Sequence, residues 1–125
     1  VAQQLYEGVA EGKEGSVGLI TYMRTDSVRI ADVAAADIRS YIESEFGKEF
    51  RPSHANSYSS KKNAQDAHEA IRPTSVHRTP LEMAKHLNKD QLKLYSLIWN
   101  RAVASQMASA VFDVTTLLIW RLKRL

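Results

Sequence analysis

Apolar residues recur at helical spacing in the second quarter of the chain. Between residues 30 and 46 they fall three or four positions apart, and charged side chains fill the positions between them; the apolar set is Ile30, Ala34, Ile38, Tyr41, Ile42 and Phe46. This period gathers them on one face of a helix. The polar cluster at residues 25–27 is typical of a helix start, and Gly47 is typical of a helix end. The pattern predicts an amphipathic helix between these points, with its apolar face in the core.

Two helix-start signals stand in the second half. Residues Thr79-Pro80-Leu81-Glu82 form a capping box with proline at the first helical position, and residues 88–91 are a variant of the same signal. They predict helices that begin at Pro80 and Lys89. The second helix carries a broad apolar stripe, made of Leu92, Tyr95, Ile98, Trp99, Ala102, Val103 and Met107. A stripe of this width predicts the central core helix, with both aromatic rings in the core rather than stacked on nucleic-acid bases.

The two ends complete the expected fold. Residues 1–8 predict a short helix that places Val1, Leu5 and Tyr6 on one side and stops at Gly8. A loop rich in glycine, glutamate and lysine then leads to a short strand before Tyr22. Residues 112–120 are β-prone and predict a strand with no obvious partner in this chain. The expected fold class is mainly α, with one or two short strands in a single domain over residues 1–125.

Composition narrows the class of protein. The 125 residues suit one compact core, and 44% hydrophobic with 25% charged residues excludes disorder. No apolar run approaches the length of a membrane span, and without an initiator methionine or signal peptide we expect a cytoplasmic piece of a longer protein. The absence of cysteine excludes disulfides, thiolate zinc sites and a cysteine nucleophile. A net charge of +3 permits an anionic partner without requiring one.

The first stretch with candidate chemistry runs from Gly18 to Ser27. Its short strand gives way to a turn at Tyr22, and Arg24 follows two residues later. Such a junction can hold a side chain outside the core on a rigid support, as a nucleophile requires. The spacing alone favours another interpretation, in which the tyrosine lies in the core and the arginine points to solvent.

The second stretch is rich in alanine and ends at Pro73. This composition favours a helix, and the proline predicts that the helix ends at Arg72. On that helix one face would carry a lysine, an amide, an imidazole and a guanidinium, which are Lys61, Gln65, His68 and Arg72. We interpret this row as a phosphate-binding strip, against the alternative of a solvated face with an incidental histidine. Because only one histidine is nearby, Asp66 and Glu69 do not predict a metal site.

Both stretches resemble signatures of one family. Residues Gly18 to Ser27 resemble the active-site signature of bacterial DNA topoisomerase I, a type IA enzyme, and residues 64–74 resemble its second signature. Weaker similarities in residues 2–6, 91–99, 106–107 and 113–116 extend the resemblance over nearly the whole chain. Only residues 118–125 look unlike the family, whose chain usually returns there into the neighbouring domain.

The resemblance implies the tyrosine-bearing domain of that enzyme, a mainly helical module with a helix-turn-helix-like core. It implies that Tyr22 attacks a phosphodiester of single-stranded DNA and holds the 5′ end while another strand passes, and that Arg24 contacts the scissile phosphate. The expected DNA-binding residues are His68, Arg72, Lys61, Gln65, Thr25 and Asp26. The implied partners are single-stranded DNA and the remaining domains of the same enzyme. The family's magnesium belongs to a separate preceding domain, so we expect no metal and no nucleotide cofactor in this chain.

The chemistry of the two stretches agrees with this interpretation. A free phenol with a pKa near 10 costs about 4 kcal/mol to ionise at neutral pH, and nearby positive charge lowers that cost. A guanidinium binds the non-bridging oxygens of a phosphate in a fixed geometry. The competing hypothesis is a helix-turn-helix module that reads duplex DNA without catalysis. It leaves Tyr22, Arg24 and the predicted strip without a function, and a scaffold domain is a third class that sequence does not test.

Overall fold

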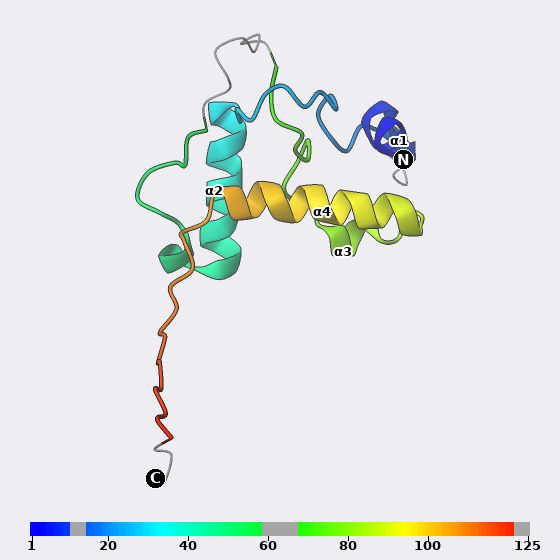
Figure 1. The fold of residues 1–125 in the computed structure, drawn as a ribbon. Helices are drawn as coiled ribbons and strands as arrows, with labels where there is room; N and C mark the ends of the chain where they lie inside the picture. Colours follow the sequence, from blue (N-terminus) through cyan, green and yellow to red (C-terminus); the bar gives the residue numbers. More distant parts are fainter. Residues whose placement is uncertain (11–14, 59–67, 122–125) are drawn as a thin grey trace.

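The computed structural model describes residues 1–10, 15–58 and 68–121 (Figure 1). The elements in chain order are α1 (Ala2–Glu7), β1 (Val9–Ala10), β2 (Ser16–Val17), α2 (Asp32–Phe46), the 3₁₀ turn η2 (Lys48–Phe50), α3 (Pro80–Met83) and α4 (Lys89–Ser105). Strands β1 and β2 pair antiparallel, with Val9 opposite Val17. The expected mainly helical fold with short strands is confirmed. None of the described helices is both long and apolar enough to cross a bilayer.

Helices α3 and α4 begin where the capping signals predict. The Asn88 side chain accepts a hydrogen bond from the Gln91 N–H at 2.9 Å, and the Gln91 side chain accepts one from the Asn88 N–H at 3.0 Å. Thr79 and Glu82 form the same reciprocal pair at the start of α3. Each box satisfies backbone N–H groups that a helix start otherwise leaves unpaired. Both predicted helix starts are therefore confirmed.

Helix α4 is the centre of the core, as its stripe predicts. It contacts α1, α2 and α3, and it buries Tyr95, Trp99, Ala102 and Val103. The Tyr95 hydroxyl donates to the Arg78 carbonyl at 2.6 Å, and the Trp99 indole N–H donates to the Val76 carbonyl at 2.9 Å. Both rings therefore lie in the core with their polar atoms paired, which confirms the prediction.

Helix α2 ends at the predicted place but begins later than the sequence indicates. Gly47 follows its last residue with φ 111°, a backbone conformation that favours glycine. At the other end, residues 25–31 are not helical. The buried Ser27 hydroxyl accepts a hydrogen bond from the Arg29 N–H at 3.3 Å. This local bond offers the backbone an alternative to the helix, so α2 begins only at Asp32.

Two segments far apart in sequence lie side by side and support the candidate site. Ile20 forms an isolated antiparallel bridge with Pro73, the Thr21 N–H donates to the Arg72 carbonyl at 2.9 Å, and the Thr74 N–H donates to the Leu19 carbonyl at 3.0 Å. The predicted helix up to Arg72 is therefore wrong over its described part, residues 68–72. Backbone pairing with residues 19–21 satisfies groups that a helix would otherwise use, and it overrides the alanine propensity. The earlier part of that prediction, residues 63–67, lies outside the described residues.

The chain ends differ from expectation. Leu5 of α1 is buried, whereas Val1 and Tyr6 are exposed. The predicted strand over residues 112–120 is absent from the described structure: the chain leaves the body after helix α4 and extends away from it (Figure 1). A strand requires hydrogen bonds to a neighbouring strand, and the described part of the chain supplies none to this segment. Its apolar side chains, including Phe112 and Trp120, are exposed.

We expect Tyr95→Phe to lower the free energy of unfolding by about 1 kcal/mol, because it leaves the part-buried Arg78 carbonyl without this donor. Tyr6→Phe is the matched control, since the same atom is removed from an exposed ring, and its effect should stay within about 0.5 kcal/mol. Urea unfolding of the three proteins measures both changes. Equal losses in the two variants would contradict the assignment of Tyr95 to the core.

Candidate active site

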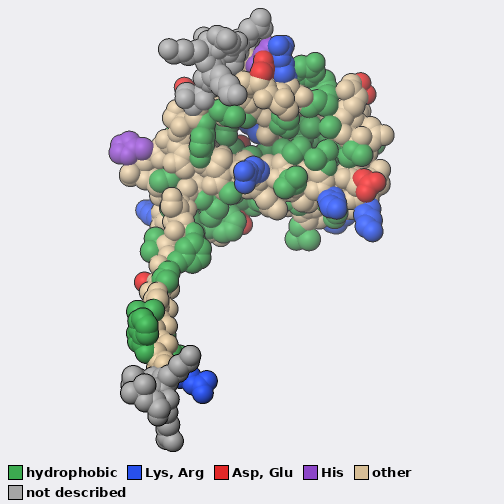
Figure 2. Space-filling view, viewed as in Figure 1, with side chains coloured by type: hydrophobic (Ala, Val, Ile, Leu, Met, Phe, Trp, Pro, Cys, Tyr) green, Lys and Arg blue, Asp and Glu red, His purple; other side chains and the backbone are tan. Residues whose placement is uncertain are grey.

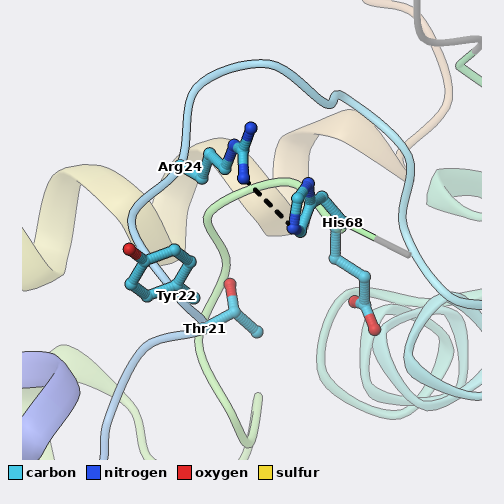
Figure 3. Close-up of a pocket in the computed structure, with 5 residues that line it drawn as sticks. Thr21, Tyr22, Arg24 and His68 are labelled. Carbon is cyan, nitrogen blue, oxygen red and sulfur yellow. Dashed lines mark hydrogen bonds between the residues drawn. The ribbon is translucent and has the colours of Figure 1, made fainter. Parts of the chain in front are cut away.

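A pocket of about 200 Å³ lies where the two paired segments meet. Thr21, Tyr22 and Arg24 line it from the first segment, and His68 and Glu69 line it from the second (Figure 3). The structure thus brings together Tyr22, Arg24 and His68, which the sequence predicted as site residues from separate stretches.

Thr21 fixes the base of the pocket. Its hydroxyl donates to the Ala70 carbonyl at 2.8 Å and accepts a hydrogen bond from the Arg72 N–H at 3.0 Å. A hydroxyl can do both at once, so one side chain satisfies two backbone groups of the other segment. Thr21 was not among the residues predicted for the site. A hydroxyl-bearing β-branched residue directly before the candidate nucleophile was the only available signal.

Tyr22 projects out of the fold at this point. It is 55% exposed, so the interpretation of a core tyrosine is wrong. Its carbonyl accepts a hydrogen bond from the Arg24 N–H at 2.9 Å, which closes a tight turn. Figure 3 shows Arg24 and His68 pointing toward each other, with the hydroxyl end of Tyr22 directed away from them. An exposed side chain can rotate, so this orientation does not bar Tyr22 from a ligand in the pocket.

The ring of Tyr22 rests against another aromatic ring. Tyr6 of α1 meets it edge to face, with the ring centroids 5.4 Å apart and an interplanar angle of 62°. The Leu19 N–H also donates to the Leu5 carbonyl at 2.7 Å, which ties α1 to the same segment. Helix α1 therefore supports the tyrosine side of the pocket, a role that the helical pattern of residues 1–8 did not reveal.

Asp26 orders the two basic side chains. Its Oδ2 lies 2.9 Å from Nε of Arg24 and 3.5 Å from Nδ1 of His68. The remaining ring nitrogen of His68, Nε2, lies 3.5 Å from Nη1 of Arg24. A guanidinium can only donate, so Nε2 is the acceptor in this contact. The contact between Nδ1 and Asp26 is too long for a hydrogen bond, and the buried Nδ1 has no hydrogen-bond partner among the described residues.

Arg72 has a different environment from His68. Its Nε lies 2.7 Å from Oε2 of Glu69, its Nη1 donates to the Pro73 carbonyl at 3.1 Å, and only 15% of its side chain is exposed. Arg72 and His68 therefore do not share one helical face, and the proposed strip is not formed by them. Lys61 and Gln65 lie outside the described residues, and Thr25 is exposed on a bend beside Arg24. The i, i+3 spacing of Glu69 and Arg72 was the available signal for their ion pair.

The charge state of Glu69 follows from this pair. Burial raises the pKa of its carboxyl, but the hydrogen bond and charge of Arg72, a backbone hydrogen bond from Ala31 and the charge of Arg29 together lower the pKa below its ordinary value. Glu69 is thus an ionised partner of Arg72. Nowhere in the described ranges do three histidine, aspartate or glutamate side chains gather closely enough to hold a metal ion.

Comparisons with known proteins point to one family. A family model described as DNA topoisomerase matches residues 1–123. Two proteins called DNA topoisomerase 1, from Xylella fastidiosa strains 9a5c and Temecula1, are 53% and 52% identical over 117 residues. These matches cover 93% of this chain but only 14% of each relative. The structure of full-length topoisomerase I from Thermotoga maritima matches with a TM-score of 0.69 and 52% identity, over 85% of this chain and 16% of that one.

We expect Glu69→Gln to lower the free energy of unfolding at pH 7 by about 1 kcal/mol, because it removes the carboxylate that pairs with Arg72. A carboxyl whose pKa is lower in the folded state stabilises the fold above its unfolded value, and this contribution disappears as the pH falls through the folded value. The difference between the two proteins should therefore shrink as the pH falls below about 4.5, the ordinary value for this group. Urea unfolding at several pH values measures it, with the exposed Glu45→Gln as control. A difference that is constant with pH would contradict the ionised pair.

Proposed function

Because this chain belongs to the bacterial DNA topoisomerase I family of type IA enzymes, we propose that Tyr22 is the nucleophile that cleaves single-stranded DNA. The observation that carries this proposal is an exposed phenol on the same pocket as a guanidinium and an imidazole, which a shared carboxylate orders. Phosphoryl transfer needs this combination of an accessible nucleophile and fixed positive donors.

In the proposed reaction the deprotonated oxygen of Tyr22 attacks the phosphorus of a phosphodiester. The bond from phosphorus to the 3′ oxygen breaks, that oxygen leaves and takes up a proton, and the 5′ phosphate stays on the tyrosine. The 3′ hydroxyl later attacks the same phosphorus and releases the tyrosine. Each step exchanges one phosphate ester bond for another, so resealing needs no nucleotide cofactor.

Arg24 is the proposed phosphate-binding residue. About half of its side chain, 49%, is exposed, and Asp26 pairs with its Nε end, which leaves guanidinium N–H groups for the non-bridging oxygens. His68 positions this guanidinium through its contact with Nη1. Asp26 contributes by orienting both side chains rather than by touching the DNA, whose phosphates its charge would repel.

In this proposal the complete reaction, with strand passage and relaxation, belongs to a longer protein. The chain spans 14% of the length of its Xylella relatives, so strand passage and relaxation of negative supercoils would involve domains beyond it, acting on DNA in the bacterial cytoplasm. The described residues do not fit a magnesium site, since Asp26 and Glu69 pair with arginines. No step on this chain is therefore assigned to magnesium, which other carboxylates of the enzyme would hold.

The first test replaces the corresponding segment of the Xylella fastidiosa enzyme with this chain. With magnesium and end-labelled single-stranded DNA, the chimera should form a covalent adduct, and Tyr22→Phe should abolish it while leaving DNA binding nearly unchanged, because it deletes only the nucleophilic oxygen. Tyr6→Phe is the matched control and should keep the adduct. An adduct that survives Tyr22→Phe would end the assignment and favour a DNA-binding module without this chemistry.

The second test uses the chain alone. We expect it to bind single-stranded DNA weakly and to leave supercoiled plasmid intact, because no described carboxylate cluster holds magnesium and no further domain orients the scissile phosphate, which is worth several kcal/mol of the barrier. Plasmid relaxation on agarose gels, with the chimera run beside the chain, is the measurement. Relaxation by the chain alone that disappears in Tyr22→Phe would show that the catalytic unit is complete within these residues.

A further inference from the structure

A second pocket is lined in part by the same segment that lines the Tyr22 pocket. It has a volume of about 290 Å³ and includes Val28, Ile30, Ile71, Ala102, Tyr58 and Arg101 among its lining residues; we call it the Arg101 pocket. Glu69 lines the Tyr22 pocket and the next residue, Ala70, lines the Arg101 pocket. Because adjacent residues line the two pockets, a flexible chain that occupies one is within reach of the other.

The wall of the Arg101 pocket suits a planar apolar ring. Five of its side chains are aliphatic, and Tyr58 adds an aromatic ring that is 43% exposed. The Tyr58 hydroxyl donates to the Ser105 carbonyl at 2.8 Å, at the end of α4. This bond holds the ring at the pocket before any ligand arrives, which lowers the entropy lost on binding. Exposed aromatic rings held in this way are the surfaces on which unpaired bases stack.

The charge of the Arg101 pocket suits an anion. Arg101 is exposed and makes no side-chain hydrogen bond or ion pair to the described part of the chain. The other cation in the wall, Arg72, is already paired with Glu69. None of the described residues that line this pocket is an aspartate or glutamate. A ligand with a negative charge would therefore gain the attraction of Arg101 without repulsion from the lining.

From these features we infer that the Arg101 pocket binds one nucleotide of the single-stranded DNA whose phosphate lies at Tyr22. The base packs on Tyr58 and the aliphatic wall, and Arg101 binds the phosphate attached to it. This inference rests on the proposed function, because it adds to the same DNA a second contact within a few nucleotides of the cleavage point. It also gives the pocket a role in placing the scissile phosphate.

The test measures binding of a fluorescent oligothymidylate to the whole chain by anisotropy at low salt. Tyr58→Leu should weaken binding about tenfold, whereas Tyr58→Phe, which keeps the ring and loses only the bond to Ser105, should weaken it several-fold less. Arg101→Ala should weaken binding and reduce the slope of log affinity against log salt by about 0.7, the share of one phosphate on a single strand. Lys93→Ala removes the same charge from an exposed position of α4 outside the pocket lining and should leave the affinity within about twofold.

A second series replaces one nucleotide at a time with an abasic site. The wild-type chain should lose affinity about tenfold at one or two positions, and Tyr58→Leu should be insensitive at those positions. Urea unfolding of each variant confirms that the fold is intact.

Two results would overturn the inference: Tyr58→Leu binding as tightly as Tyr58→Phe, or Arg101→Ala behaving as Lys93→Ala. The outcome is separate from that of the proposed function. A covalent adduct in the chimera with normal binding by Tyr58→Leu would remove only the pocket, whereas weakened binding by Tyr58→Leu without an adduct would remove only the nucleophile.

Discussion

The hydroxyl of Thr21 joins two segments that stand 49 to 51 residues apart in sequence. It donates to one backbone carbonyl and accepts from one backbone N–H of the second segment, beside the main-chain bonds that Ile20 and its neighbours make there. Tyr22 directly follows Thr21. His68 lies two residues before Ala70, whose carbonyl accepts the hydrogen bond from the Thr21 hydroxyl. The relative position of the phenol and the imidazole therefore depends on this junction, and a change in its register would move both.

Carboxylates at the junction determine which basic side chains could still bind an anion. Asp26 orients Arg24 and His68, and Glu69 holds Arg72 against the backbone of its own segment. A fixed carboxylate partner lowers the entropy that a long basic side chain loses when it binds a phosphate. The pairing therefore orients the basic side chain, but it also reduces the net positive charge of the site. The site thus combines few free cations with defined geometry. This suits an enzyme that holds one phosphate in place better than it suits a protein that binds DNA by charge alone.

The sequence predicted those parts of the fold that depend on local interactions. The starts of α3 and α4 follow from capping boxes within four residues, and the central position of α4 follows from the width of its stripe. Predictions failed where distant contacts decide. Residues 68–72 have helical propensity, but Ala70 and Arg72 bond to Thr21 and the Ala70 N–H donates to the Arg29 carbonyl. The Ser27 hydroxyl accepts a hydrogen bond from the Arg29 N–H before α2 begins. The β-prone tail has no neighbouring strand in the described structure.

The same distinction applies to the candidate site. Tyr22, Arg24 and His68 could be found from the two signatures, and the structure brings them to one pocket. Their supports could not be found, because the contact between Tyr6 and Tyr22 and the bonds of Thr21 exist only after the chain folds. In the proposed reaction the guanidinium of Arg24 is positioned by His68, which stands 44 residues further along the chain. The proposed nucleophile therefore has no positioned phosphate-binding partner in a nascent, misfolded or proteolysed chain, and DNA cleavage would be confined to the folded protein.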